Sequence, residues 1–167
     1  MKLTSTIQVK KGESLYKELD AMSYLSKNLY NSTLYHVRQH FFETKKYKNC
    51  NTLNLEFTKT KQRDYYALPA KLAQQTMRMV EQNFKSFFAL LKNPDVEVKI
   101  PKYLDKQGRY LVIFTEQAIS KPELKNGYLK LCKINNRIKL PSFIKKINQI
   151  RVVPRPTCDC YDIEIIH

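Results

Sequence analysis

The chain has 167 residues, enough for one hydrophobic core, and its hydrophobic content of 43% is that of a folded protein and not of a disordered arm. Lys and Arg number 30 against 15 Asp and Glu, so the net charge is +15 and a polyanion such as nucleic acid is the expected partner. No run of about 18 apolar residues occurs and the N-terminus lacks a secretory signal, which excludes a membrane-spanning helix and favours the cytoplasm.

The first half of the chain begins with a strand pattern and continues with a helix pattern. Polar and β-branched residues alternate in LTSTIQV, which predicts a short strand that ends at Gly12. From Glu13 to Phe41 apolar residues recur every three or four positions, which predicts a long amphipathic helix. The basic segment 44–64 has weak periodicity, and we expect a loop with one short helix or turn.

The stretch AKLAQQTMRMVEQNFKSFF predicts a second amphipathic helix. Pro69 suits its first turn and Pro94 stops it. The predicted buried stripe consists of Leu72, Thr76, Met79, Val80, Phe84, Phe87, Phe88 and Leu91. The opposite face carries Lys71, Gln74, Gln75, Arg78, Gln82 and Lys85. Lys and Arg suit phosphates and Gln suits sugar hydroxyls and base edges, so this face either contacts nucleic acid or simply faces water.

The second half of the chain reads as several short strands separated by turns. RYLVIFT, INQIRVV and CYDIEII have strand patterns, LKNGYLKL predicts a hairpin centred on Asn126 and Gly127, and NNRIKLP follows another turn. Such spacing favours a small barrel or sandwich. Because a lone strand is not stable, we expect the N-terminal strand to join the later sheet and the helices to form an insertion within it.

The strand region is strongly basic. Nine Lys or Arg residues and no Asp or Glu lie between Leu124 and Cys158, and a surface of one sign fits a phosphate backbone better than an ordinary solvated sheet face. Asp162 and Glu164, in the last strand, are expected on a solvated face. The candidate nucleic-acid contacts here are Lys130, Lys139, Lys145, Lys146, Arg151 and Arg155. Tyrosine is also frequent and can stack on bases, although the sequence singles out no individual ring.

Other classes of partner and site are disfavoured. A membrane surface is the second choice for so basic a chain, but the charge is spread over its length and Trp is absent. The acidic residues are scattered and there are only three glycines, so neither a carboxylate pair nor a phosphate-binding loop is recognisable. His36 and His40 lack a third metal ligand. The cysteines, expected to be reduced thiols, are Cys50, Cys132, Cys158 and Cys160. We therefore expect no catalytic residue, metal, cofactor or small-molecule substrate.

Six segments, in this order, resemble the N-terminal portion of TnpB proteins, transposon-encoded RNA-guided nucleases related to type V CRISPR effectors. They are TIQVK, KNLYNSTLYHVRQ, LPAKLAQQTMRMVEQNFKSFF, IPKYLDKQGRYLVIFTEQAIS, NGYLKLCKINNRIKLP and IRVVPRPTCDCYDIEI. The resemblance covers essentially the whole chain. It implies an α+β fold in which an oligonucleotide-binding-like wedge barrel, 1–11 and 97–167, is interrupted after its first strand by a helical recognition lobe, 12–96. The positions that match the family are Asn31, Gln75, Phe88, Pro101, Gln117 and Ile119.

The same resemblance implies a function. In the family these two modules hold the guide RNA and the guide-target duplex and help to read a short motif on target DNA. Family members continue into a RuvC-like nuclease domain, whereas this chain stops at His167, so we expect a binding module that does not cleave nucleic acid alone. The alternatives are one half of a split nuclease, with a separate RuvC-like polypeptide as partner, and a nuclease-dead DNA-binding repressor.

Overall fold

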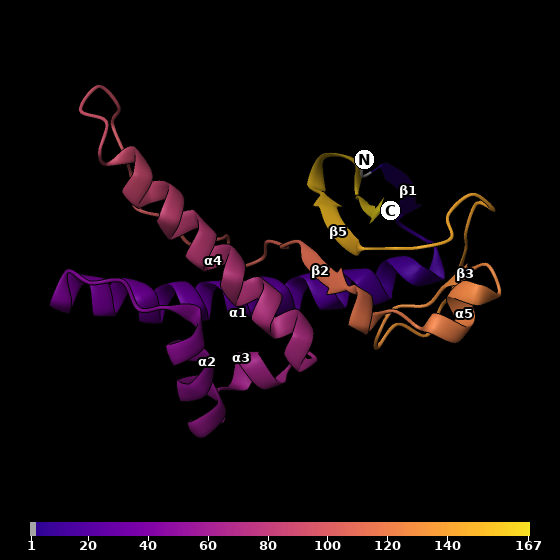
Figure 1. The fold of residues 1–167 in the computed structure, drawn as a ribbon, viewed down its shortest axis with the longest axis horizontal. Coiled ribbons are helices and arrows are strands. Elements are labelled where there is room, and N and C mark those ends of the chain that lie inside the picture. Colours follow the sequence, from indigo (N-terminus) through magenta and orange to yellow (C-terminus); the bar gives the residue numbers. More distant parts are fainter. Residues whose placement is uncertain (1–2) are drawn as a thin grey trace.

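A long helix runs through the molecule, and a small sheet lies at one end of it (Figure 1). The computed structural model describes residues 3–167. The helices are α1 (Ser14–Thr44), α2 (Cys50–Lys59), α3 (Arg63–Tyr66), α4 (Ala70–Leu90) and α5 (Lys121–Lys125), with short 3₁₀ helices η1 (Glu116–Ala118) and η2 (Pro156–Cys158). The strands are β1 (Thr4–Lys10), β2 (Val112–Thr115), β3 (Tyr128–Leu129), β4 (Ile138–Lys139), β5 (Gln149–Arg155) and β6 (Cys160–Ile166). None of the helices within 3–167 is both long and apolar enough to cross a membrane.

The main sheet has the strand order β1-β6-β5-β2, and all its pairs are antiparallel. Strand β1 pairs with β6 in a register that sets Thr4 opposite Ile166 and Lys10 opposite Cys160. The architecture is therefore α+β, and the predicted return of the N-terminal strand to the later sheet is confirmed. Strands β3 and β4 form a separate two-stranded ribbon, and the strands described in 3–167 do not close into a barrel.

The chain buries two hydrophobic clusters, and both α1 and α4 contribute to each. Leu19 at the start of α1 and Leu72 at the start of α4 pack against the sheet in the first cluster. Leu34 and Phe84, further along the same two helices, pack with α2 in the second cluster. The predicted long helix is confirmed, and its apolar residues recur at a spacing that keeps one stripe buried from Leu15 to Val37. The two helices thus join the sheet to the helical end of the molecule.

Residues 96–111, here called the returning segment, lead the chain from the end of α4 back along α1 to the sheet. The side-chain amide of Asn31 donates to the backbone oxygen of Leu104 at 2.9 Å and accepts from its backbone nitrogen at 2.8 Å. Nearer the sheet, the backbone nitrogen of Tyr110 donates to the backbone oxygen of Ser23 at 3.1 Å. The Asn31 side chain and the backbone of α1 therefore hold a segment that pairs with none of the strands described in 3–167.

Segment 44–64, which the sequence predicts as a loop with one short helix or turn, contains α2 and the first half of α3. The side chain of Asn49 caps α2 by accepting from the backbone nitrogen of Thr52 at 2.9 Å. Leu53 and Phe57, four residues apart, are its buried side chains together with Cys50 at its start. Two apolar positions are too few to stand out as a helical period, so burial against α4 determines this helix.

The predicted hairpin centred on Asn126 and Gly127 is wrong. The preceding residues form the short helix α5, which begins with Pro122 in its first turn. Gly127, with φ of 80°, ends that helix in the left-handed region instead of turning a hairpin. Strand β3 follows directly and pairs with β4, from the NNRIKLP stretch.

Candidate nucleic-acid interface

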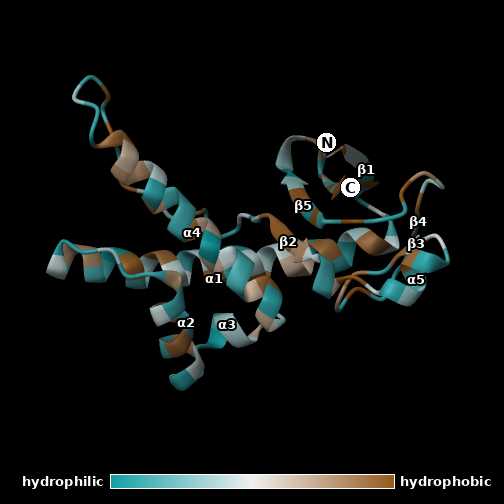
Figure 2. Ribbon diagram, viewed as in Figure 1, coloured by the Kyte–Doolittle hydropathy of each residue, from teal (hydrophilic) through white to brown (hydrophobic). Residues whose placement is uncertain are grey.

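The candidate nucleic-acid contacts in the first half of the chain lie on the outward face of α4. Lys71, Arg78 and Lys85 are exposed, and Gln74 and Gln75 are half-buried at its edge. Figure 2 shows hydrophilic residues along α4, which packs on α1 with its apolar side. The Lys85 ammonium lies 3.8 Å from a carboxylate of its own helix, Glu81. Within 3–167, Lys71 and Arg78 form no ion pair and leave their charges available to a ligand.

Two of these residues also line a small polar cavity. Gln74 and Arg78 meet the first turns of α2 around a volume of about 230 Å³. The side-chain oxygen of Asn54, also in its lining, is buried and has no hydrogen-bond partner among residues 3–167. Burial, with the nearby charge of Glu81, raises the pKa of the Cys50 thiol to about 11, so this thiol stays protonated and donates to a backbone oxygen of α4. The cavity therefore offers amide and guanidinium groups but no reactive nucleophile.

The basic strand β5 is partly neutralised, so the expected surface of one sign is wrong there. Arg151 Nε lies 3.2 Å from Glu164 Oε2, and Arg155 Nε lies 2.7 Å from Asp162 Oδ2. The register sets Arg151 directly opposite Glu164 on β6. The two acidic residues predicted on a solvated face thus balance two of the predicted phosphate contacts. Whether Arg151 and Arg155 also contact nucleic acid stays a prediction.

The four remaining candidates are lysines of the β3-β4 end of the molecule. Lys130 follows β3 and is half-buried, Lys139 lies in β4, and Lys145 and Lys146 lie in the loop before β5. None of the four forms an ion pair within the described residues. The ribbon of β3 and β4 lies at one end of α1, whereas α4 extends toward the other end (Figure 1). The candidates therefore form two separate basic regions and not one site.

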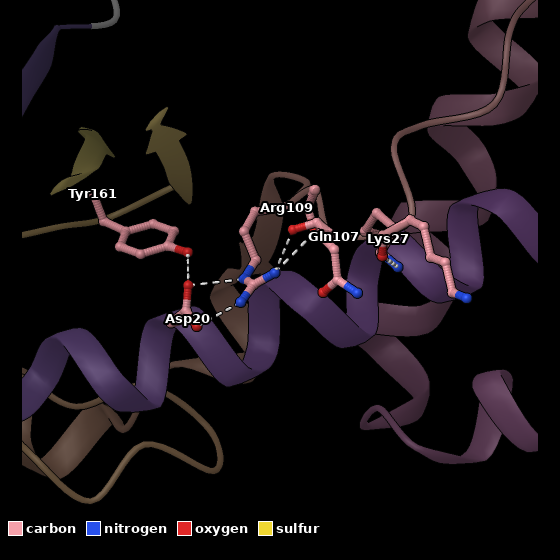
Figure 3. Close-up of polar contacts among 7 residues, drawn as sticks. Asp20, Lys27, Gln107, Arg109 and Tyr161 are labelled. Carbon is pink, nitrogen blue, oxygen red and sulfur yellow. Dashed lines mark hydrogen bonds and ion pairs between the residues drawn. The ribbon is translucent and has the colours of Figure 1, made fainter. Parts of the chain in front are cut away.

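A polar cluster that the sequence analysis missed joins α1, the returning segment and β6 (Figure 3). Arg109 donates to Asp20 through Nε at 2.8 Å and through Nη2 at 2.9 Å, a two-pronged arrangement. The Tyr161 hydroxyl donates to Oδ1 of the same carboxylate at 2.7 Å. The hydrogen bonds from Arg109 hold the pKa of Asp20 below its usual value, whereas burial and this carboxylate raise the pKa of Tyr161.

A cavity of about 520 Å³ lies beside this cluster. Asp20 and Arg109 both line it, but their side chains are already hydrogen-bonded to each other. The Asp20 carboxylate also accepts a hydrogen bond from the Tyr161 hydroxyl. A carboxylate with a lowered pKa and three donors is a poor general base. The cluster consequently acts as a clamp that joins α1, the returning segment and β6.

A buried lysine holds the returning segment at a second point. Lys27 is 3% exposed, and its ammonium donates to the side chain of Asn28 and to the backbone oxygen of Lys106, each at 2.6 Å. It also lies 4.3 Å from the centroid of the Tyr24 ring. The sequence does contain a signal for these contacts, because polar residues recur along α1 at three- and four-residue steps beside the apolar stripe. Their partners lie too far along the chain for spacing to identify.

The cysteines and histidines form no metal site among residues 3–167, where no group of three or more His, Cys, Asp or Glu is placed to hold an ion. The sulfur atoms of Cys158 and Cys160 lie next to each other across a tight turn, so these two cysteines are placed where they can pair. That they are reduced thiols stays a prediction. Asp159 between them has φ of 47°, a turn conformation that brings the flanking residues together. Cys50 and Cys132 are free.

The positions that the resemblance to TnpB proteins singles out have different surroundings in the structure. Asn31 holds the returning segment and Ile119 is buried, which are structural roles. Gln75 is half-buried on the outward side of α4, and Gln117 is exposed. Comparison of the chain with protein-family models gives no match, and comparison with curated proteins gives none either. The family resemblance and the function it implies are therefore matters of proposal.

Proposed function

We propose that this chain is a nucleic-acid-binding module of the TnpB type, which holds a structured guide RNA and the duplex of guide and target DNA. The observation that carries the proposal is the outward face of α4. Lys71 and Arg78 lie seven residues apart, about 10 Å along the helix axis, and both are exposed without an acidic partner in the described chain. Gln75 lies between them on the same side. This combination suits a phosphate backbone with a polar contact beside it.

The architecture supports the same proposal. The chain begins with a strand, continues with helices and ends with an antiparallel sheet that the first strand joins. The family resemblance implies the same order. In this proposal the open sheet is the oligonucleotide-binding-like wedge, a fold whose barrels are commonly only partly closed, and α1 to α4 are the recognition module. The net charge of +15 gives both parts a long-range attraction to a polyanion.

A salt titration tests the proposal. We expect the affinity of the chain for a structured RNA to fall steeply as salt rises, because each neutralised phosphate releases a counterion. The double variant Lys71→Ala with Arg78→Ala removes two cations and is expected to lower the slope of log affinity against log salt by about two. The measurement is fluorescence anisotropy at a series of salt concentrations.

The matched control is Lys121→Ala. The side chain of Lys121 is 73% exposed. Its ammonium lies 3.6 Å from the Glu116 carboxylate, so its charge is already neutralised locally. We expect its removal to change the slope by much less than the double variant does. Binding that is independent of salt, or no binding of RNA at all, would contradict the proposal.

A further inference from the structure

Two exposed aromatic rings flank one arginine near the C-terminal end of α1. The guanidinium carbon of Arg38 lies 4.9 Å from the centroid of the Tyr103 ring and 5.6 Å from that of Phe42. Tyr103 is 44% exposed and Phe42 is 46% exposed, whereas the aromatic residue Phe84 in the neighbouring core is fully buried. A cation–π contact between a guanidinium and a ring is favourable, but it does not by itself explain why both rings stay exposed to solvent. We call these three side chains the stacking platform.

The platform is held in place before any ligand arrives. Phe42 follows Arg38 by four residues on α1, which sets the two side chains on one face of the helix. Arg38 Nη1 also donates to the backbone oxygen of Pro101 at 3.4 Å. One residue beyond Tyr103, the paired hydrogen bonds between Asn31 and Leu104 fix the returning segment against α1. Little conformational freedom remains to be lost on binding.

The surroundings of the platform are basic. Lys45 and Lys46 follow Phe42 at the end of α1, and Lys102 precedes Tyr103. All three are exposed, and none forms an ion pair within 3–167. Glu43 comes directly after Phe42, but consecutive residues of a helix do not share a face. Both segments that supply the rings therefore carry unpaired positive charge beside them in the chain.

We propose that the stacking platform binds unpaired bases of single-stranded nucleic acid. Every base has a flat face that stacks on an aromatic ring or a guanidinium plane, and the neighbouring lysines suit the phosphates that connect successive bases. The inference rests on the proposed function and extends it, because it assigns an unpaired strand to the helical end of the molecule, whereas α4 contacts a backbone. No base-specific hydrogen bond is required, so the preference is for strandedness and not for sequence.

The test is binding of a short oligouridylate and a short oligothymidylate, measured by anisotropy at constant salt, with a double-stranded RNA as the reference probe. Tyr103→Ala and Phe42→Ala are each expected to weaken binding of both oligonucleotides about 5- to 100-fold, the range for loss of one stacked base. Tyr103→Phe keeps the ring and is expected to bind as the unmodified chain does. Binding of the double-stranded RNA should change less than twofold in all three variants, a threshold of about 0.4 kcal/mol.

Tyr66→Ala is the matched control, because Tyr66 is 57% exposed on α3, outside the platform. This variant should bind the oligonucleotides and the double-stranded RNA as the unmodified chain does. If Tyr103→Ala and Phe42→Ala bind the oligonucleotides normally while double-stranded RNA still binds, the platform assignment is overturned and the proposed function stands. If neither kind of probe binds the unmodified chain, both are overturned. Weakening of the oligouridylate alone assigns the platform to RNA, and weakening of the oligothymidylate alone assigns it to DNA.

Discussion

Phe84→Ala is expected to lower the free energy of unfolding by about 3 to 5 kcal/mol, the usual range for deleting a fully buried phenyl ring. Phe84 lies on α4 at the centre of an aromatic group. Its ring centroid lies 5.6 Å from that of Tyr47, 6.1 Å from those of Phe87 and Phe88, and 6.5 Å from that of Phe41. None of these partners can move into the space without leaving another contact, so a cavity is expected. Chemical denaturation followed by circular dichroism measures the loss.

Phe42→Ala serves as the control for this substitution. Phe42 lies next to the aromatic group, but it is 46% exposed and its removal leaves no cavity. We expect it to lower the free energy of unfolding by less than about 1 kcal/mol. Equal losses for the two variants would contradict the assignment of Phe84 to the core.

We also expect Phe84→Ala to lower local stability more in some parts of the chain than in others. Phe84 belongs to the second hydrophobic cluster with Leu53 of α2, whereas Ile163 of β6 belongs to the first. Amide exchange in Phe84→Ala should therefore accelerate more in α2 than in β6, because local opening follows the weakened cluster. An equal acceleration in both would show that the two clusters open only together, through α1 and α4.

Periodicity was sufficient to predict the large elements of this fold. The long stripes of α1 and α4 and the alternation in β1 and β6 each extend over enough residues to exceed chance, and the requirement that a lone strand find a partner predicted the pairing of β1. Helix α2 was missed because its burial depends on α4. The stripe of α4 was predicted slightly too long, since Leu91 is exposed. The division into 1–11 with 97–167 and 12–96 stays a prediction.

The candidate interface shows where sequence reasoning ends. The outward face of α4 follows from spacing within a single helix, and the structure places Lys71 and Arg78 on it as predicted. Pairing across strands is different, because Glu164 neutralises Arg151 only through the register of β5 against β6. A run of residues free of acids in sequence is therefore not a surface free of acids. The same reason hides the stacking platform, where Tyr103 reaches α1 from a distant segment.

The second large effect is expected from Asp20→Asn, which should lower the free energy of unfolding by about 2 kcal/mol at neutral pH. The substitution keeps the shape of the side chain but removes the charge that Arg109 and Tyr161 share, and the new amide donor faces the donors of Arg109. The matched control is Asp159→Asn. Asp159 pairs with Lys11 at 3.1 Å, but both side chains are more than 60% exposed, so we expect a loss of less than about 1 kcal/mol.

The dependence of this loss on pH separates the ion pair from simple packing. Arg109 lowers the pKa of Asp20 below the ordinary value of 3.8, so the folded state favours the carboxylate. The stabilisation is therefore present above the ordinary pKa and is lost as pH falls through the lowered pKa of the folded state. The difference between the unmodified chain and Asp20→Asn, measured by denaturation from neutral to acid pH, should shrink toward zero in that window. A difference that stays constant down to the lowest pH would mean that the amide disturbs packing. The clamp that joins α1, the returning segment and β6 would then not depend on the charge of Asp20.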